Sequence, residues 1–126
     1  MISSIAGVAT PPTRSVYAAS KHALHGLFGS IRIELAQRGV GVTIACPGYV
    51  ATPMRHNALL ADGSPQGFDQ AEGRRMMSAQ AAGAAILAAA LKRKRLLLLG
   101  RETRLARLLE FFAPAELDRL LARFTR

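Results

Sequence analysis

The sequence predicts an α/β fold in which parallel strands alternate with helices. Two helix–strand pairs support this prediction. A helical pattern over residues 14–38 precedes the β-branched run at 40–46, and an alanine-rich segment at 78–92 precedes a second apolar run at 95–99. Because each helix returns the chain to the same end of the sheet, strands that alternate with helices pair in parallel.

The first half of the chain supplies a strand end, a loop, a long helix and a buried strand. Residues 2–4 are expected to end a strand, and 5–13 form a loop because they contain one glycine and two prolines. Over 14–38 the apolar residues recur at spacings of three and four, as one face of a helix requires. Gly39 suits the end of that helix, and the run 40–46 predicts a buried strand.

The second half supplies a loop, a strand and three helices. Residues 49–77 are mixed in character and predict a loop with one helical turn near 54–60. Ser78 suits the N-cap of the helix over 78–92, and Gly100 closes the strand at 95–99. Pro114 separates two amphipathic helices, which we expect at 101–112 and 115–124.

The composition indicates one small domain of 126 residues without an internal disulfide. The single cysteine cannot form one and fits a reducing compartment, and no spacing of Cys and His suggests a metal site. The N-terminus lacks the features of a signal peptide. The longest apolar run, 81–91, has about half the length of a membrane span. We therefore expect a soluble, cytoplasmic protein without a metal.

The positive charge gathers near the C-terminus. Residues 92–126 hold ten Lys/Arg and four Asp/Glu, whereas 1–91 hold seven and four. A solvated helical face is the simpler explanation of this excess, and an acidic partner is the alternative. Nucleic acid is not expected, because no aromatic residues interleave with the basic run 92–95. The apolar stripes of 101–126, opposed by arginines, either pack on the body of the protein or lie on an anionic membrane.

A tyrosine and a lysine one helical turn apart suggest acid–base chemistry. Tyr17 and Lys21 point to the same side of the predicted helix, because residues four apart are neighbours on a helix surface. An ammonium beside a phenol favours the phenolate, and that suits a general acid and base. Ser4 and the loop after Cys46 follow the carboxyl ends of predicted strands, where ligands of parallel sheets bind. These groups are expected to converge on one pocket.

Three motifs occur together in a fixed order. Ser4 precedes Tyr17 by thirteen residues, Tyr-Ala-Ala-Ser-Lys occupies 17–21, and Pro-Gly-x-Val-x-Thr occupies 47–52. In these features the chain resembles the short-chain dehydrogenase/reductase family over about residues 1–54. The resemblance implies a Rossmann-like, doubly wound parallel sheet, of which the chain contains the C-terminal part. It also implies an NAD(P)-dependent oxidoreductase that reduces a carbonyl or oxidises an alcohol by hydride transfer.

The resemblance assigns a role to each matching residue. Tyr17 is the expected catalytic acid/base, Lys21 supports it and bonds the cofactor ribose, and Ser4, rather than Ser3, orients the substrate oxygen. The expected cofactor is NAD or NADP. The residues expected to bind it are Tyr17, Lys21, Pro47, Gly48, Val50 and Thr52, and the backbone of Val50 would meet the nicotinamide carboxamide.

The chain also departs from the family pattern. It has no Gly-rich turn of the form G-x-x-x-G-x-G and no Asn-Asn-Ala-Gly segment, and family members run to roughly twice its length. We therefore expect a partial domain that does not bind the cofactor usefully alone. The residues that choose between NAD and NADP are expected in the part not present. The alternative is an inactive remnant that acts only in protein or membrane association.

The resemblance divides the chain into three segments. Residues 1–54 are the expected catalytic and cofactor-loop segment, 55–77 the substrate loop, and 78–126 the C-terminal helices and last strand. Apolar residues in or beside the substrate loop favour an apolar carbonyl or alcohol substrate: Met54, Leu59 and Leu60. The helix at 14–38 is the expected surface of a homodimer, as the family often pairs subunits through it.

Four further residues receive simpler interpretations. Cys46 at a strand end is expected to be a buried structural thiol. His22 and His25 beside Lys21 receive no catalytic role, whereas His56 in the substrate loop is a candidate for substrate contact.

Overall fold

The computed structural model describes residues 1–54, 56–59, 62–65, 67, 73 and 75–123. Its central strand is β1 (Ile44–Pro47), which pairs in parallel with β4 (Leu96–Leu99). On the other edge of β1, Ile2 forms a parallel bridge to Ala45, and the Ser3 amide donates to the Ala45 carbonyl at 2.7 Å. The predicted α/β fold with parallel strands is confirmed.

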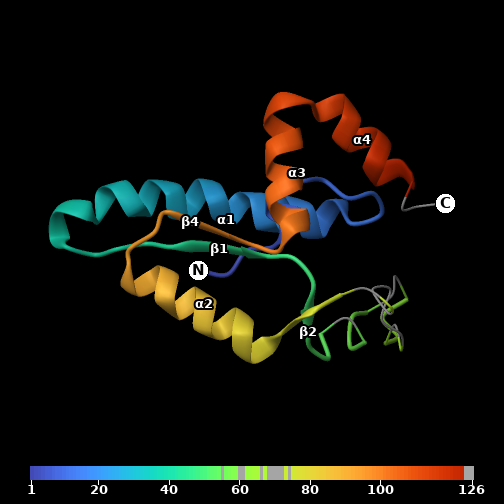
Figure 1. Cartoon of the computed structure of the whole chain (residues 1–126), viewed down its shortest axis with the longest axis horizontal. Helices are drawn as coiled ribbons and strands as arrows, with labels where there is room; N and C mark the ends of the chain where they lie inside the picture. The colour runs from blue at the N-terminus through green and yellow to red at the C-terminus, as the bar shows by residue number, and fades with distance from the viewer. Residues whose placement is uncertain (55, 60–61, 66, 68–72, 74, 124–126) are drawn as a thin grey trace.

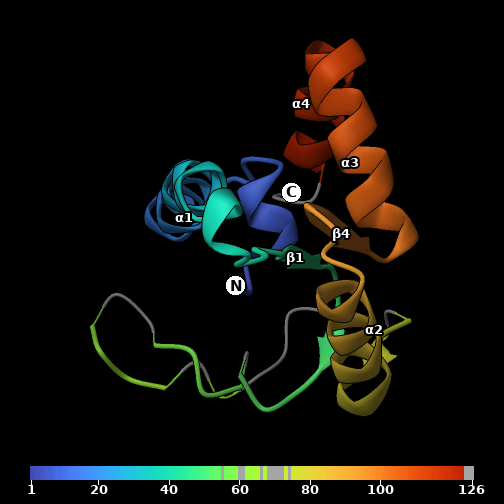
Figure 2. The ribbon, with the colours of Figure 1, turned by 90° about the vertical axis from the view of Figure 1, so that its left-hand side faces the viewer.

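Helices cover both faces of these strands. Helix α1 (Ser15–Glu34) lies on one face, and α2 (Ala79–Leu91) lies on the other (Figures 1 and 2). Helices α3 (Arg101–Phe112) and α4 (Pro114–Ala122) follow β4 and stand on the same side as α1. This arrangement is the doubly wound layout that alternating helices and strands predict.

Three short elements complete the fold. A 3₁₀ turn, η1 (Ile5–Gly7), follows the bridging residue Ile2, and a second, η2 (Ala36–Arg38), follows α1. After β1 the chain forms β2 (Val50–Ala51), which pairs in parallel with β3 (Met77–Ser78). The two ends of the predicted substrate loop are therefore held together by strand pairing.

Local sequence signals explain where the elements begin and end. The Ser78 hydroxyl accepts from the Ala81 amide at 3.1 Å and caps α2, as predicted. Gly39 and Gly100 adopt positive φ values of 73° and 93°, which favour glycine. Gly39 ends η2 after α1, and Gly100 turns the chain from β4 into α3.

The core consists of two small groups of buried side chains. Val8, Ile44 and Cys46 form the group between η1, the strands and α1. Ala9, Ala106 and Leu117 form the second, which joins α3 and α4 to the loop after η1. Both groups contain residues of that loop, so it links the sheet to the C-terminal helices.

Some predicted boundaries were wrong. The strand expected at 40–46 occupies Ile44–Pro47, because β4 begins opposite Ile44 and gives the preceding residues no paired strand. The Asn57 amide donates to the Pro53 carbonyl at 3.0 Å, which fits the helical turn expected near 54–60, although residues 55 and 60 lie outside the described residues. Phe124, the expected end of the last helix, also lies outside them. Within the described ranges, no helix is both long and apolar enough to cross a membrane.

Candidate active site

The two serines before η1 have different environments. Ser3 is 4% exposed, and its hydroxyl lies 3.3 Å from the Lys21 carbonyl and 3.1 Å from Nε2 of His25. Ser4 is half-buried and caps η1, where its hydroxyl accepts from the Ala6 amide at 3.2 Å. A hydroxyl that accepts one bond can still donate its hydrogen. Ser3 is therefore the more buried of the two serines, and the assignment of Ser4 to the substrate oxygen stays a prediction.

Tyr17 and Lys21 lie together on α1. Both side chains are half-buried, and Nζ of Lys21 lies 5.5 Å from the centre of the Tyr17 ring. This distance falls within the range of a cation–π contact. The N-terminal half of α1 stands at the end of the sheet where β1 and β4 finish (Figure 1). The structure therefore brings the predicted acid/base and its lysine to the carboxyl edge of the strands.

The loop after β1 is held at the same edge. Pro47 ends β1, and the Gly48 amide donates to the Leu99 carbonyl of β4 at 3.0 Å. The Tyr49 carbonyl accepts from the Met77 amide at 2.9 Å, and Val50 pairs with the same residue. Thr52, just beyond β2, is exposed. Backbone bonds thus fix the positions expected to face a nicotinamide.

Glu102 is a contributor to this loop that the sequence analysis missed. Glu102 lies in the first turn of α3, and its Oε1 accepts a hydrogen bond from the Tyr49 amide at 3.3 Å. A Cβ on Gly48 or Gly100 would collide with the same carboxylate, and one on Gly48 would also press on the Thr103 hydroxyl. The two glycines therefore give Glu102 the space to reach the loop. An acidic residue directly after a Gly-closed strand was the signal that could have identified it.

Comparisons with known proteins bear on the family and the fold of this chain. A family model described as short chain dehydrogenase matches residues 1–62. A Bos taurus protein named dehydrogenase/reductase SDR family member 7B is 38% identical over 122 residues, covering 96% of this chain and 38% of that protein. The chain belongs to the short-chain dehydrogenase family. It spans about two fifths of the length of this relative.

Other members of the short-chain dehydrogenase family extend the match. The Xenopus tropicalis protein of the same name is 38% identical over 117 residues, covering 90% of this chain and 37% of that protein. Among solved structures, a short-chain dehydrogenase from Novosphingobium aromaticivorans has a TM-score of 0.64 at 18% identity, over 91% of this chain and 35% of its own. An acetoin dehydrogenase from Enterobacter cloacae has a TM-score of 0.57 at 26% identity, over 83% and 41%. These likenesses confirm the Rossmann-like fold.

A polar cluster of His25, Ser3 and Cys46 lies between α1 and β1. Nε2 of His25 lies 3.1 Å from the Ser3 hydroxyl and 3.5 Å from Sγ of Cys46. A Cβ on Gly7 would collide with the Ser3 hydroxyl and the His25 ring. Burial raises the pKa of the Cys46 thiol, which fits the structural role predicted for it. His25, to which sequence analysis gave no role, thus fastens α1 to the strand ends.

This cluster predicts that the chain becomes less stable in mild acid. Burial, followed by the nearby His22 and Arg107, lowers the pKa of His25 below its ordinary 6.5. As the pH falls, His25 therefore takes up a proton in the unfolded chain at a higher pH than in the folded chain. Stability is complete above pH 6.5 and declines below it, until His25 protonates in the folded state as well.

Thermal melting above and below pH 6.5 measures this effect. His25→Asn should lower the melting temperature at neutral pH and flatten the acid decline. His56→Asn is the matched control, because His56 is exposed in the substrate loop. An acid decline that His25→Asn leaves unchanged would contradict the assignment.

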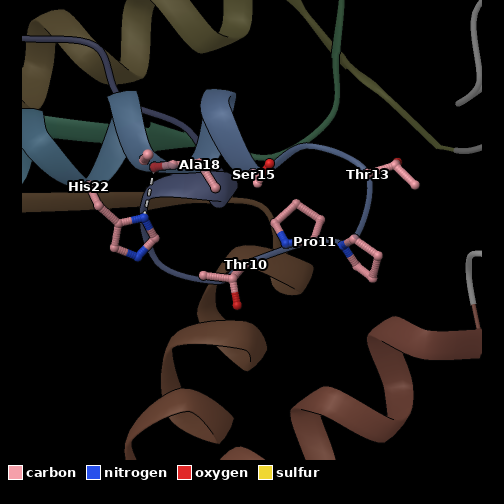
Figure 3. A pocket seen from close by; sticks show the side chains of 8 residues that line it. Thr10, Pro11, Thr13, Ser15, Ala18 and His22 are labelled. Carbon is pink, nitrogen blue, oxygen red and sulfur yellow. Dashed lines mark hydrogen bonds between the residues drawn. The ribbon is translucent and has the colours of Figure 1, made fainter.

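A separate hollow of about 400 Å³ lies beside the start of α1. Figure 3 shows it between the loop at 10–13 and the side chains of Ala18 and His22, whose ring bonds the Ala18 carbonyl at 2.9 Å. Since a helix turns about 100° per residue, these residues lie about 100° around α1 from Tyr17 and Lys21. The hollow therefore opens beside a different side of α1 from the predicted catalytic pair.

Proposed function

We propose that this short-chain dehydrogenase segment provides the catalytic part of an NAD(P)-dependent oxidoreductase that interconverts a carbonyl and an alcohol. The observation that carries the proposal is the position of the Lys21 Nζ, 5.5 Å from the centre of the Tyr17 ring, on the half of α1 that lies at the end of the sheet where β1 and β4 finish (Figure 1). A general acid, a charge that supports it and a hydroxyl for the substrate oxygen are the groups that carbonyl reduction needs.

The proposed roles follow from the chemistry of these side chains. Tyr17 donates its phenolic hydrogen to the carbonyl oxygen during reduction and takes it back during oxidation. Ser4 donates a hydrogen bond to that oxygen, and the Lys21 ammonium stabilises the phenolate left on Tyr17. When bound, the nicotinamide cofactor supplies or accepts the hydride.

The loop residues fit the nicotinamide end of such a cofactor. Gly48 and Val50 present a fixed backbone, Pro47 shapes the turn, Thr52 offers an exposed hydroxyl, and Lys21 would bond the ribose. A Gly-rich pyrophosphate cradle does not occur in the sequence. We therefore infer weak cofactor binding by residues 1–126 alone, and calorimetry showing micromolar binding would refute that inference.

A chimeric enzyme tests the function directly. Residues 1–126 would replace the matching part of the Bos taurus relative, which would supply the remaining segment. We expect oxidation of NADH or NADPH in the presence of ketones, and comparison of the two would identify the preferred cofactor. A folded chimera that binds cofactor but reduces no ketone would favour the alternative of an inactive remnant.

We propose an apolar substrate for this reaction. Met54 and Leu59 expose 61% and 70% of their surfaces at the start of the predicted substrate loop, whereas Leu60 lies outside the described residues. An exposed apolar loop residue gains free energy when a hydrophobic ligand covers it. In the chimera, Met54→Ser should raise KM for an apolar ketone more than KM for a small polar ketone. Equal changes would argue against this substrate class.

We also propose that α1 forms the surface of a homodimer. Val16, Ala23 and Leu27 share its outer face at spacings of seven and four, and all three are exposed. Val16 is 83% and Leu27 56% exposed, so association would remove substantial apolar area from water.

Sedimentation equilibrium tests this surface with one charge substitution. Leu27→Asp should shift the isolated chain from dimer to monomer, because pairing would bury the new carboxylate. Leu87→Asp on α2 is the control, since Leu87 is 61% exposed on the opposite side of the sheet. A monomeric wild-type chain, or equal effects of both variants, would exclude α1 as the interface.

A further inference from the structure

The outer face of α3 carries large apolar side chains that the fold does not cover. Leu105 and Leu108 are 53% and 56% exposed, and Phe111 and Phe112 are 72% and 76% exposed. The two phenyl rings stack edge to face with centres 4.9 Å apart. Monomeric proteins rarely gather exposed aromatic and aliphatic side chains in this way without a partner.

The inner face of α3 is already occupied. Thr103 and Ala106 are buried, Leu109 packs on the second core group, and Glu102 reaches the loop after β1. These contacts fix the rotation of the helix. The apolar outer face therefore cannot turn inward without breaking the core that joins α3 and α4 to η1.

Cations accompany this apolar face. Arg101 and Arg104 are exposed on its N-terminal half, and Nε of Arg104 lies 3.5 Å from the Leu98 carbonyl. At about 100° per residue, both arginines fall within the sector between Leu105 and Phe111. The two acidic residues of α3 fall outside that sector: Glu102 faces the Tyr49 amide, and Glu110 lies on the side of Thr103.

We propose that the outer face of α3 docks on an anionic lipid surface. Leu105, Leu108, Phe111 and Phe112 would enter the boundary between headgroups and acyl chains, and Arg101 and Arg104 would contact lipid phosphates. Exposed leucine and phenylalanine beside arginine are the composition of helices that lie in the membrane plane. The combination favours a lipid surface over a second copy of the chain, because pairing two such faces brings like charges together.

Flotation with vesicles tests the proposal on the chain of 126 residues. Vesicle-bound protein floats, whereas aggregated protein sinks. The chain should float with vesicles of phosphatidylcholine mixed with phosphatidylserine, and much less with phosphatidylcholine alone or at high salt. Equal flotation with both vesicle types, or none with either, would overturn the proposal.

Two pairs of substitutions separate the apolar and charged contributions. Phe111→Ser with Phe112→Ser should weaken vesicle binding by more than about tenfold, because two rings no longer leave water. Arg101→Gln with Arg104→Gln should weaken it by roughly fivefold for each charge. The control is Leu87→Ser with Leu91→Ser, because these leucines are 61% and 77% exposed on α2. Loss of binding in this control as well would assign the flotation to general apolarity and overturn the proposal.

A fluorescent reporter and a sedimentation measurement complete the test. The chain has no tryptophan, so Phe112→Trp places a single indole in the face, and its emission should shift to the blue with anionic vesicles. An unshifted emission would contradict insertion. If Phe111→Ser with Phe112→Ser converted a dimer into a monomer without changing flotation, the occupant would be a second copy and the proposal would fail.

Discussion

Tyr17→Phe should lower kcat of the chimeric enzyme by about 10²–10⁴-fold, the contribution that general acid catalysis ordinarily makes. The substitution removes the proton donor and keeps the ring, so the contact with Nζ of Lys21 at 5.5 Å should survive. Folding and cofactor binding should therefore change little. Steady-state kinetics and thermal melting of the same preparation would show whether the loss is chemical rather than structural.

Two further variants accompany Tyr17→Phe, one as a control and one as a test of the lysine. Ser30 lies on α1, and its hydroxyl donates to the Gly26 carbonyl at 3.3 Å, so Ser30→Ala should leave turnover unchanged. Lys21→Met should lower kcat and also raise KM for the cofactor, because the lysine is proposed to serve both. Near-normal turnover in Tyr17→Phe would exclude this tyrosine as the acid.

Leu117→Ala should destabilise the chain by about 2–5 kcal/mol, the usual cost of such a truncation in a core. Leu117 is 4% exposed and is the large buried residue of the group that includes Ala9 and Ala106. Its alanine neighbours cannot expand into the space left behind. Since whole domains are stable by only about 5–15 kcal/mol, this loss is a large fraction of the total stability.

Leu120→Ala provides the comparison, because Leu120 belongs to the same helix and is 37% exposed. It should cost much less, since less of its surface leaves water on folding. Urea unfolding followed by circular dichroism would compare the two. Equal midpoints for both variants would show that α4 is not anchored through Leu117.

The sequence predicted the elements whose signals are local. The three-and-four spacing of apolar residues identified α1, although the helix ends at Glu34 and a 3₁₀ turn replaces its predicted last residues. Ser78 and Gly100 marked the start of α2 and the end of β4 correctly. The length of β1 was wrong, because a strand ends where its partners end. Those partners, Ile2 and β4, lie more than forty residues away in sequence.

In the candidate site, too, the local features were predicted and the contacts between distant residues were not. Tyr17 and Lys21 were predicted to share a helix face, and the structure places them together. The roles of His25 and Glu102 depend on distant contacts, with Ser3 and Cys46 in one case and with the Tyr49 amide in the other. Neither set of contacts follows from spacing along the chain, so sequence reasoning gave His25 no role and did not consider Glu102.

The bond from the Tyr49 amide to Glu102 joins the loop after β1 to the first turn of α3. It makes the position of the loop after β1 and the position of α3 thermodynamically linked. A molecule that favours the bonded loop therefore protects the amides of α3 from hydrogen exchange, and Glu102→Gln should weaken that protection. Linkage is reciprocal. A molecule that binds α3 in this position must therefore strengthen ligand binding at the loop by the same factor by which the loop ligand strengthens the binding of that molecule.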